Sequence, residues 1–323
     1  MKKVLFVSHG FACFMSDILF HGLMKLGYDV YEYPQGMHYY GGDSIFGGKK
    51  NLGKDTFLNF CYFNFQKSSM TDKEIIEQDY DYIIITSWRP EQPWILENIY
   101  KRFKGKVPIA FVDGEDDLHI RQDEFYNDVY FKRERKLGTY ENKNIKPITF
   151  GIIDRKEYEV PCNRKYLLSF IASGHNIDGL RCQMFRNLAQ NWNKEKMFYL
   201  DVERAKDKML LYKKYRQILL QSQIGISIAG EGYDTYRYWE IPYFKSLLMA
   251  DIADIYMPDN NFTDMENAVF FKNINEFNEK LGYLQNHPND IEKIAEAGHK
   301  FLLGNHTSLH RAVYVINALE EIK

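Results

Sequence analysis

The sequence contains little cysteine and no long apolar run. None of its four cysteines belongs to a Cys-x-x-Cys pair, which argues against a zinc ribbon or a thioredoxin-type redox site. No segment approaches the roughly 18 apolar residues that a membrane-spanning helix requires. The apolar run that follows the N-terminus, Val4 to Val7, is too short for a signal peptide. We therefore expect a cytoplasmic protein with no membrane span and with reduced thiols at Cys13, Cys61, Cys162 and Cys182.

An excess of either charge is also absent. Lys plus Arg number 42 and Asp plus Glu number 44, which gives a net charge of -2 over 323 residues. This balance argues against a protein that coats nucleic acid through its overall charge, while a local basic patch stays open. Aromatic residues, in contrast, are abundant at 16%, and such a composition rules out global disorder. The length indicates two domains, with one large domain as the alternative.

The first half of the chain alternates strand and helix. Val4 to Val7 is typical of a buried parallel strand, Ser16 to Leu26 has helical apolar spacing, and Tyr28 to Tyr33 is a second strand. This β-α-β order predicts a right-handed crossover and a parallel sheet. Residues 34–70 are rich in glycine and are interpreted as a long loop that lines a cleft. The further elements are a helix over 72–78, a strand over 82–86, a helix over 93–103, and strands over 108–112 and 148–153.

The second half repeats this alternation. Strands are predicted over 167–172, 197–200, 224–228, 246–250 and 268–271, and helices over 180–190, 208–221, 236–244, 274–285, 288–302 and 308–321. Two such blocks favour an α/β fold of two doubly wound, Rossmann-like domains that face each other across a cleft. We expect an N-terminal domain over residues 1–155 and a C-terminal domain over 156–323, with the last helix able to pack back on the first domain.

The turn Ser8-His9-Gly10-Phe11 follows the first predicted strand directly. Ligands of open α/β sheets bind at the carboxyl ends of strands, and a glycine there lets the backbone approach a ligand closely. No Gly-x-Gly-x-x-Gly pattern follows, so the fingerprint of a dinucleotide site is absent. His9 is therefore a candidate functional residue, and a local hydrogen bond within the turn is the alternative.

An acidic cluster, Asp113-Gly114-Glu115-Asp116-Asp117, follows another buried strand. Such carboxylates can bind a divalent cation or favour the N-terminus of the next helix. We favour a third role, in which they pair with basic residues on the acceptor side or between domains. The stretch Phe131 to Lys136 can supply those partners, although its charge pattern by itself favours a solvated helix face.

The third candidate is the glycine-containing turn after the strand over 224–228. Backbone N–H groups in such a turn and the positive end of the following helix suit a phosphate group. Arg237 can neutralise a diphosphate, and Glu240 on the same helix can accept hydrogen bonds from ribose hydroxyls. A plain strand-loop-helix with an Arg–Glu ion pair is the alternative. The candidate binding residues in the turn itself are Gly230, Glu231, Gly232, Tyr233 and Asp234.

From Gly230 onward the sequence resembles the C-terminal domain of group-1-type GT-B glycosyltransferases, especially the CgeB-like (spore-maturation) branch. That family carries a glycine-containing loop, an Arg and a Trp-Glu pair, and then a strand and a segment that ends in His-Thr. The corresponding pieces here are Arg237, Trp239-Glu240, the strand over 246–250, and Gly298 through His306-Thr307. The resemblance covers roughly residues 165–320, and the N-terminal half fits the fold alone.

The sequence departs from the family at two points. Members usually carry a Gly-x-Pro pattern after the glutamate, whereas Ile241 to Ser246 here has an early proline and no glycine. The partner of Glu240 in the family's Glu-x7-Glu signature falls at Gly232 or Tyr233, and Glu231 stands nine positions before Glu240. The sugar-contacting part of the pocket therefore lies outside the family pattern.

The resemblance implies transfer of a sugar from a nucleotide-sugar donor to an acceptor hydroxyl, without a metal and without a cofactor. The C-terminal domain would bind the donor through the turn, Arg237 and Glu240. His306-Thr307 would close that site, or Thr307 or Ser308 would begin the last helix as its N-cap. The aromatic residues placed to stack on a base or a sugar are Phe11, Tyr233, Tyr236 and Trp239.

An enzyme that inverts configuration also needs a general base near the acceptor hydroxyl. His9, Asp17 and Asp113 are candidates because all three are expected near strand ends that face the cleft. The acceptor itself, whether glycan, protein, small molecule or modified DNA, is not specified by the sequence. The alternatives are a non-catalytic nucleotide-sugar binder, a nucleotide-sugar epimerase of the same fold, and a phage-type glycosyltransferase that acts on modified DNA bases through a local basic cleft.

Overall fold

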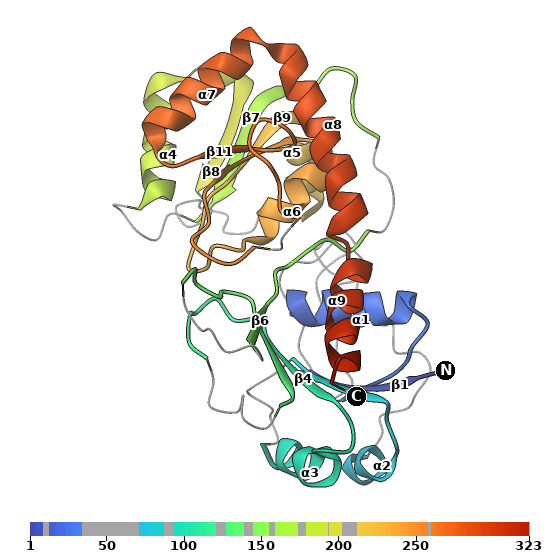
Figure 1. Ribbon diagram of the computed structural model, residues 1–323. Helices are drawn as coiled ribbons and strands as arrows, with labels where there is room; N and C mark the ends of the chain where they lie inside the picture. Colours follow the sequence, from blue (N-terminus) through green and yellow to red (C-terminus); the bar gives the residue numbers. More distant parts are fainter. Residues whose placement is uncertain are drawn as a thin grey trace, which may run out of the picture. The chain divides into compact units, whose positions relative to one another are not determined.

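The chain folds into two compact α/β units (Figure 1). The first unit comprises Met1–Ile153, Ile255–Pro258 and Thr307–Lys323, and the second comprises Asp154–Asp254 and Asp259–His306. The computed structural model describes residues 1–8, 13–33, 71–86, 93–120, 127–138, 145–154, 159–173, 179–192, 194–201, 212–257 and 260–322. The last helix of the chain therefore belongs to the first unit.

The first unit is built on a parallel sheet. In the described residues its strand order is β2-β1-β3-β4-β5-β6. The strands are β1 (Lys3–Val7), β2 (Asp29–Tyr33), β3 (Tyr82–Ile85), β4 (Ile109–Asp113), β5 (Val129–Lys132) and β6 (Ile145–Pro147). The helices are α1 (Phe14–Lys25), α2 (Asp72–Glu77), α3 (Pro93–Phe103) and α9 (Ser308–Glu320). Since β1, β3 and β4 are apolar and buried along nearly their whole length, the sheet has the pattern of a parallel sheet covered on both faces.

The second unit contains a separate parallel sheet. Its order in the described residues is β11-β10-β9-β7-β8. The strands are β7 (Tyr166–Ala172), β8 (Met197–Asp201), β9 (Ser222–Ser227), β10 (Leu247–Asp251) and β11 (Val269–Phe271). The helices are α4 (Leu180–Asn191), α5 (Tyr212–Leu220), α6 (Tyr236–Tyr243), α7 (Ile274–Asn286) and α8 (Pro288–Asn305). The predicted α/β class with two Rossmann-like sheets is thus confirmed.

One part of the first sheet differs from the sequence prediction. The segment expected as a solvated helix face instead forms β5 and the buried turn after it, and Lys132, Arg133 and Glu134 are all buried. The last strand is Ile145–Pro147, whereas 148–153 contributes only an isolated bridge between Ile152 and Thr307. The charged residues 132–134 made the segment look solvent-exposed, because the groups that pair with them lie elsewhere in the chain and do not contribute to the local sequence pattern.

The C-terminal helix is fixed tightly within the first unit. Figure 1 shows α9 lying against α1, and the two helices touch at Gly22, where an added Cβ would lie 2.1 Å from the carbonyl oxygen of Ser308. The Ser308 N–H donates to Ile152 O at 2.8 Å. The buried Arg311 donates from Nε to the carbonyl oxygens of Thr149 and Phe150, each at 2.9 Å. The start of α9 is therefore held by backbone contacts that tolerate no extra atoms.

The Gly22→Ala substitution is expected to lower the free energy of unfolding by about 2 kcal/mol, because overpacking at a helix contact forces the two backbones apart. Gly282→Ala is the matched control. Gly282 also lies inside a helix but has open space around it, so alanine there should stabilise by about 0.5–1 kcal/mol. Thermal and urea unfolding of both variants check the prediction, and equal effects of the two substitutions would contradict it.

Candidate functional site

The loop over residues 229–235, called the donor loop below, leads from β9 into α6 at the carboxyl edge of the second sheet. It is a compact turn, since Gly230 N–H donates to Gly232 O at 2.9 Å and Thr235 N–H donates to Tyr233 O at 2.9 Å. Thr235 is the N-cap of α6, and its hydroxyl shares a 2.7 Å hydrogen bond with Ser227 at the end of β9. The first N–H groups of α6 therefore lie directly beyond the loop, where an anion can accept from them.

Arg237 and Glu240 lie on α6 behind the donor loop. The Nε atom of Arg237 is buried and has no hydrogen-bond partner in the described part of the chain. Glu240 is buried, and its Oε2 accepts a hydrogen bond of 2.9 Å from the hydroxyl of Tyr215 on α5. Burial, and then the charge of Glu240, raises the pKa of Tyr215 well above its usual value, so the phenol stays a donor. Arg237 Nε and Glu240 Oε1 are therefore not hydrogen-bonded to each other.

Two further expected residues are part of the core of the second unit. Trp239 is fully buried, and its Nε1 donates to Asp234 Oδ1 at 2.7 Å. The expectation that Trp239 stacks on a ligand is therefore wrong, because the ring packs inside an aromatic cluster. His306 is also fully buried, 4.9 Å from Trp239 between ring centroids, and its Nε2 donates to Asn260 O at 3.0 Å. Its assignment to the donor site stays a prediction.

Thr307 lies in the other unit from His306. It is the N-cap of α9, and its hydroxyl lies 2.9 Å from Nδ1 of His310. The N-cap alternative for this residue is therefore observed.

Among the donor-loop residues, Glu231 is exposed, Gly232 is buried and Tyr233 is half-buried. A donor role for the loop as a whole stays a prediction.

Two charged residues that the sequence did not single out also lie at this edge. Arg181, in the first turn of α4, donates from Nε and Nη2 to Ile228 O at 3.1 and 2.9 Å. Asp251, the last residue of β10, accepts from Ala229 N–H at 3.0 and 3.2 Å. An added Cβ on Gly230 would lie 2.6 Å from Arg181 Nη2, so a side chain there would displace the guanidinium of Arg181. The position of Asp251 at the end of a strand was the available signal for that residue.

Asp251 is an unusual acid. Burial raises its pKa to about 6, while hydrogen bonds from the backbone and the positive charge of Arg181 act in the opposite direction. A carboxylate that is costly to ionise lies beside the candidate phosphate loop, and perturbed groups of this kind cluster at functional sites.

Three catalytic candidates were predicted in the first unit, His9, Asp17 and Asp113. His9 lies outside the described residues, as does Phe11, which was expected to stack on a base or a sugar. Asp17 and Asp113 are each 1% exposed. Asp113 Oδ2 accepts from Tyr130 at 2.6 Å and from Lys132 at 2.9 Å. Asp113 is thus already engaged by protein groups, and its role as a general base stays a prediction.

The acidic cluster after β4 pairs with the basic stretch after β5, as the sequence led us to favour. Lys132 contacts Asp117 at 3.4 Å in addition to Asp113. Arg133 pairs with Asp116, and its Nε donates to Gly114 O at 2.8 Å. Within the residues that the structure describes, no group of three or more His, Cys, Asp or Glu side chains is arranged to hold a metal ion.

A buried polar cluster follows the first-unit strands at the edge where His9 would follow β1. Ser8 Oγ donates to Glu32 Oε1 at 3.2 Å, and the hydroxyls of Ser16 and Thr86 lie 2.7 Å apart. Thr86 also donates to Val7 O at 3.2 Å. Because these side chains come from the ends of β1, β2 and β3 and from α1, they mark the carboxyl edge at which ligands of parallel sheets bind.

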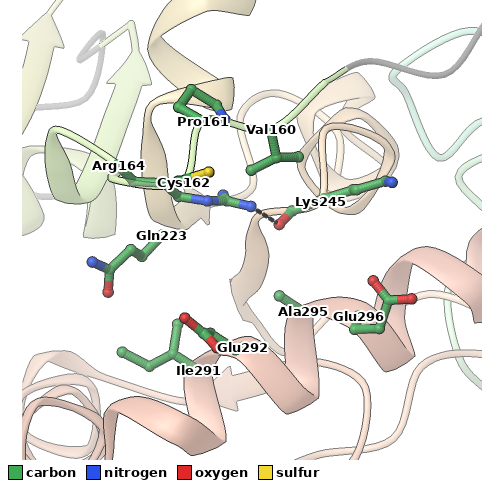
Figure 2. Close-up of a pocket in the computed structure, with 10 residues that line it drawn as sticks. All are labelled: Val160, Pro161, Cys162, Arg164, Gln223, Lys245, Ile291, Glu292, Ala295 and Glu296. Carbon is green, nitrogen blue, oxygen red and sulfur yellow. Dashed lines mark hydrogen bonds between the residues drawn. The ribbon is translucent and has the colours of Figure 1, made fainter.

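A pocket of about 380 Å³ lies at the opposite, amino-terminal edge of the second sheet (Figure 2). Arg164 and Lys245 line one side, and Glu292 and Glu296 on α8 line the other. The guanidinium of Arg164 donates to Lys245 O at 2.5 Å and to Ser246 Oγ at 3.1 Å. The pocket is thus distinct from the donor loop, which lies at the other end of the same strands.

Lys245 adopts a backbone conformation that usually belongs to glycine. Its φ is 58°, and its N–H donates to Pro242 O at 3.0 Å as the chain leaves α6. Helices commonly end on a glycine in this left-handed conformation. Lys245 therefore occupies the place where the glycine missing from Ile241–Ser246 would serve, at the cost of backbone strain.

Comparison with known proteins agrees with this architecture. Residues 164–317 match the sequence model of the family described as glycosyl transferase-like. A search among curated proteins gave no match. No helix in the described residues is long and apolar enough to cross a membrane.

Solved structures resemble the whole fold. An alpha-glucosyltransferase in complex with UDP-glucose and DNA containing an abasic site is 10% identical, with a TM-score of 0.62 and coverage of 99% of both chains. Sucrose-phosphate synthase from Thermosynechococcus elongatus is 8% identical, with a TM-score of 0.55 and coverage of 100% of this chain and 99% of that one. TarM is 11% identical, with a TM-score of 0.48, and this chain spans about half of it, 54%, from 74% of its own length. These likenesses show a GT-B fold, and the family match identifies residues 164–317 as glycosyl transferase-like.

The Lys132→Met substitution is expected to lower the free energy of unfolding by about 3 kcal/mol, because it leaves Asp113 buried without its cation. Adding Asp113→Asn to that variant should restore part of the loss. Asp117→Asn, which alters a half-exposed partner of the same lysine, should cost less than about 1 kcal/mol. Urea unfolding measures all three, and a Lys132→Met variant as stable as the Asp117→Asn variant would refute the prediction.

The Lys245→Gly substitution is expected to stabilise the protein by about 1 kcal/mol, because glycine adopts the left-handed conformation without a Cβ penalty. Lys245→Asn should give a smaller gain, since asparagine tolerates this conformation, and Lys245→Ala should give none. The midpoints of thermal unfolding distinguish the three, and a glycine variant less stable than the alanine variant would contradict the predicted relief of backbone strain.

Proposed function

We propose that the protein transfers a sugar from a nucleoside-diphosphate sugar to an acceptor hydroxyl, and that the donor loop and α6 hold the diphosphate of the donor. The observation that carries this proposal is Arg237, a cation whose buried Nε has no hydrogen-bond partner among the described residues and which lies in the first turn of α6, at the helix N-terminus. Both features lie inside the stretch that matches the glycosyl transferase-like family.

The chemistry of sugar transfer explains why such a site is useful. Negative charge develops on the departing diphosphate, and a preorganised helix N-terminus with a cation stabilises that charge in the transition state. We propose that this arrangement serves in place of a metal ion. Glu240, whose carboxylate is oriented by the hydroxyl of Tyr215, is proposed to accept a hydrogen bond from the ribose.

On the acceptor side, we propose that the turn after β1 supplies the general base if configuration is inverted. Asp113 Oδ2 already accepts hydrogen bonds from Tyr130 and Lys132. His9 is then the candidate of choice because imidazole titrates near neutral pH and the residue follows the carboxyl end of β1.

The first acceptor to test is a hydroxyl on a modified DNA base. Two solved alpha-glucosyltransferase complexes that contain DNA cover 99% of both chains, with TM-scores of 0.62 and 0.60. Glycan, protein and small-molecule acceptors are the other classes in this proposal. The Arg, Trp-Glu and His-Thr motifs support placing the chain in the CgeB-like branch, and we propose that it acts in the cytoplasm.

Arg237→Ala is expected to weaken binding of UDP or another nucleoside diphosphate by roughly thirtyfold, since a hydrogen-bonded charge pair of this kind contributes about 2 kcal/mol. Isothermal titration calorimetry with a panel of nucleoside diphosphates measures the effect. Arg186→Ala removes the same charge from an exposed position on α4 and should leave the affinity unchanged.

The same panel tests the proposal as a whole. If no nucleoside diphosphate or nucleotide sugar binds the wild-type protein, the donor-site proposal fails. Binding without release of nucleotide in the presence of any acceptor class identifies a non-catalytic binder. Release of a rearranged free sugar without an acceptor identifies an epimerase.

A further inference from the structure

A single peptide group at the exit of β9 is held at both ends by charged side chains. The carbonyl oxygen of Ile228 accepts two hydrogen bonds from the guanidinium of Arg181, and the N–H of Ala229, which belongs to the same peptide group, donates to both carboxylate oxygens of Asp251. The cation thus lies at the negative end of the peptide dipole and the anion at its positive end. We call this arrangement the peptide clamp.

The peptide clamp fixes the direction in which the donor loop begins. Arg181 comes from α4 after β7, whereas Asp251 ends β10, so the two residues reach the peptide from opposite neighbours of β9. Gly230 follows immediately and packs on the guanidinium of Arg181, so a side chain at this position would push that guanidinium away. A rotation of the Ile228–Ala229 peptide would therefore reorient the N–H groups of the next residues.

The negative charge of Asp251 does not stabilise the folded state. Burial penalises its ionised form, and its pKa lies at about 6 instead of 3.8. The folded state therefore holds the Asp251 proton more tightly than the unfolded chain does, so this group favours folding at low pH and that contribution is lost as the pH rises through 6. Among the described residues, the positive charge of Arg181 acts on Asp251, and the charge of Asp251 in turn acts on the buried phenol of Tyr238.

We propose that Asp251 and Arg181 are positioning residues for donor binding: through the Ile228–Ala229 peptide they set the orientation of the donor loop and of the N–H groups that meet the diphosphate. The inference rests on the proposed donor site. The Asp251 carboxylate destabilises the fold at neutral pH, yet both of its oxygens accept from the Ala229 N–H. We explain this cost by the role of that amide in orienting the donor loop.

The decisive variant is Asp251→Asn, which keeps the size of the side chain and one oxygen for Ala229 N–H but removes the charge and the second acceptor. At pH 7.5 we expect a higher melting temperature than wild type, because a costly buried charge is gone, and a dissociation constant for UDP at least fivefold larger. As the pH falls to 5, Asp251 protonates in the wild type, and the difference in melting temperature should shrink. In steady state, the donor KM should rise more than kcat falls.

Two comparisons make the experiment specific. Asp264→Asn alters an exposed carboxylate of the same unit, which also accepts from a backbone N–H, and should leave UDP affinity unchanged. Arg181→Lys should weaken UDP binding, and adding Asp251→Asn should weaken it further by less than the product of the single effects, because both act through one peptide.

The outcomes separate the two proposals. If wild-type protein binds no nucleoside diphosphate, the proposed function fails. If wild type binds UDP and Asp251→Asn binds it equally well, or if Asp251→Asn loses stability and affinity together at pH 7.5, the positioning role is overturned and Asp251 is a structural residue.

Discussion

Charged side chains at the ends of parallel strands have lost much of their water, and each must be held by a countercharge or by backbone groups. This requirement shapes the carboxyl edges of both sheets. In the first unit, Lys132 and Asp113 meet at 2.9 Å, with both side chains buried. In the second, Arg181 and Asp251 satisfy each other through the peptide between them. The loops that follow the strands owe their shape to these contacts.

The two solutions have different consequences. In a direct ion pair such as Lys132–Asp113 the two charges neutralise each other. This pair also fixes the acidic cluster after β4 in place. A charge that is hydrogen-bonded to a peptide group acts differently, because it fixes the direction of the backbone N–H groups in the loop that follows. Arg237 completes the second arrangement with a buried Nε that has no partner in the described residues. The proposed donor site thus belongs to the second arrangement, whereas the buried charges of the first unit hold the loops of that unit.

Much of the fold followed from apolar periodicity because most elements are locally encoded. The strands β1, β3, β7 and β10 and the last two helices lie within two or three residues of their predicted bounds. The exception was β5, whose charged end at Lys132 is compatible with a buried strand only because Asp113, nineteen residues earlier, supplies the countercharge. The sequence offered this basic stretch as a partner for the acidic cluster, but its local charge pattern favoured a solvated helix face over a buried strand.

The candidate site was predictable to the level of the loop and no further. The glycine turn and Arg237 followed from phosphate chemistry, whereas the burial of Trp239 depends on how Asp234 and the aromatic cluster pack around it. Arg181 and Asp251 were missed because neither stands in a recognisable motif; they become meaningful only when the strand order brings β7 and β10 to either side of β9.

Two features of the second unit lower its stability, and they lie at the two ends of β10, the strand that follows α6. Lys245 takes a strained backbone conformation where α6 leads into β10, and Asp251 buries a charge where β10 ends. Natural proteins retain such costs where geometry matters more than stability. Because α6 begins at the donor loop and Lys245 follows its last turn, strain at one end and a clamped peptide before the other both bear on where the helix N-terminus points. The donor site is thus defined less by the residues that would touch a nucleotide than by those that decide the placement of this short helix.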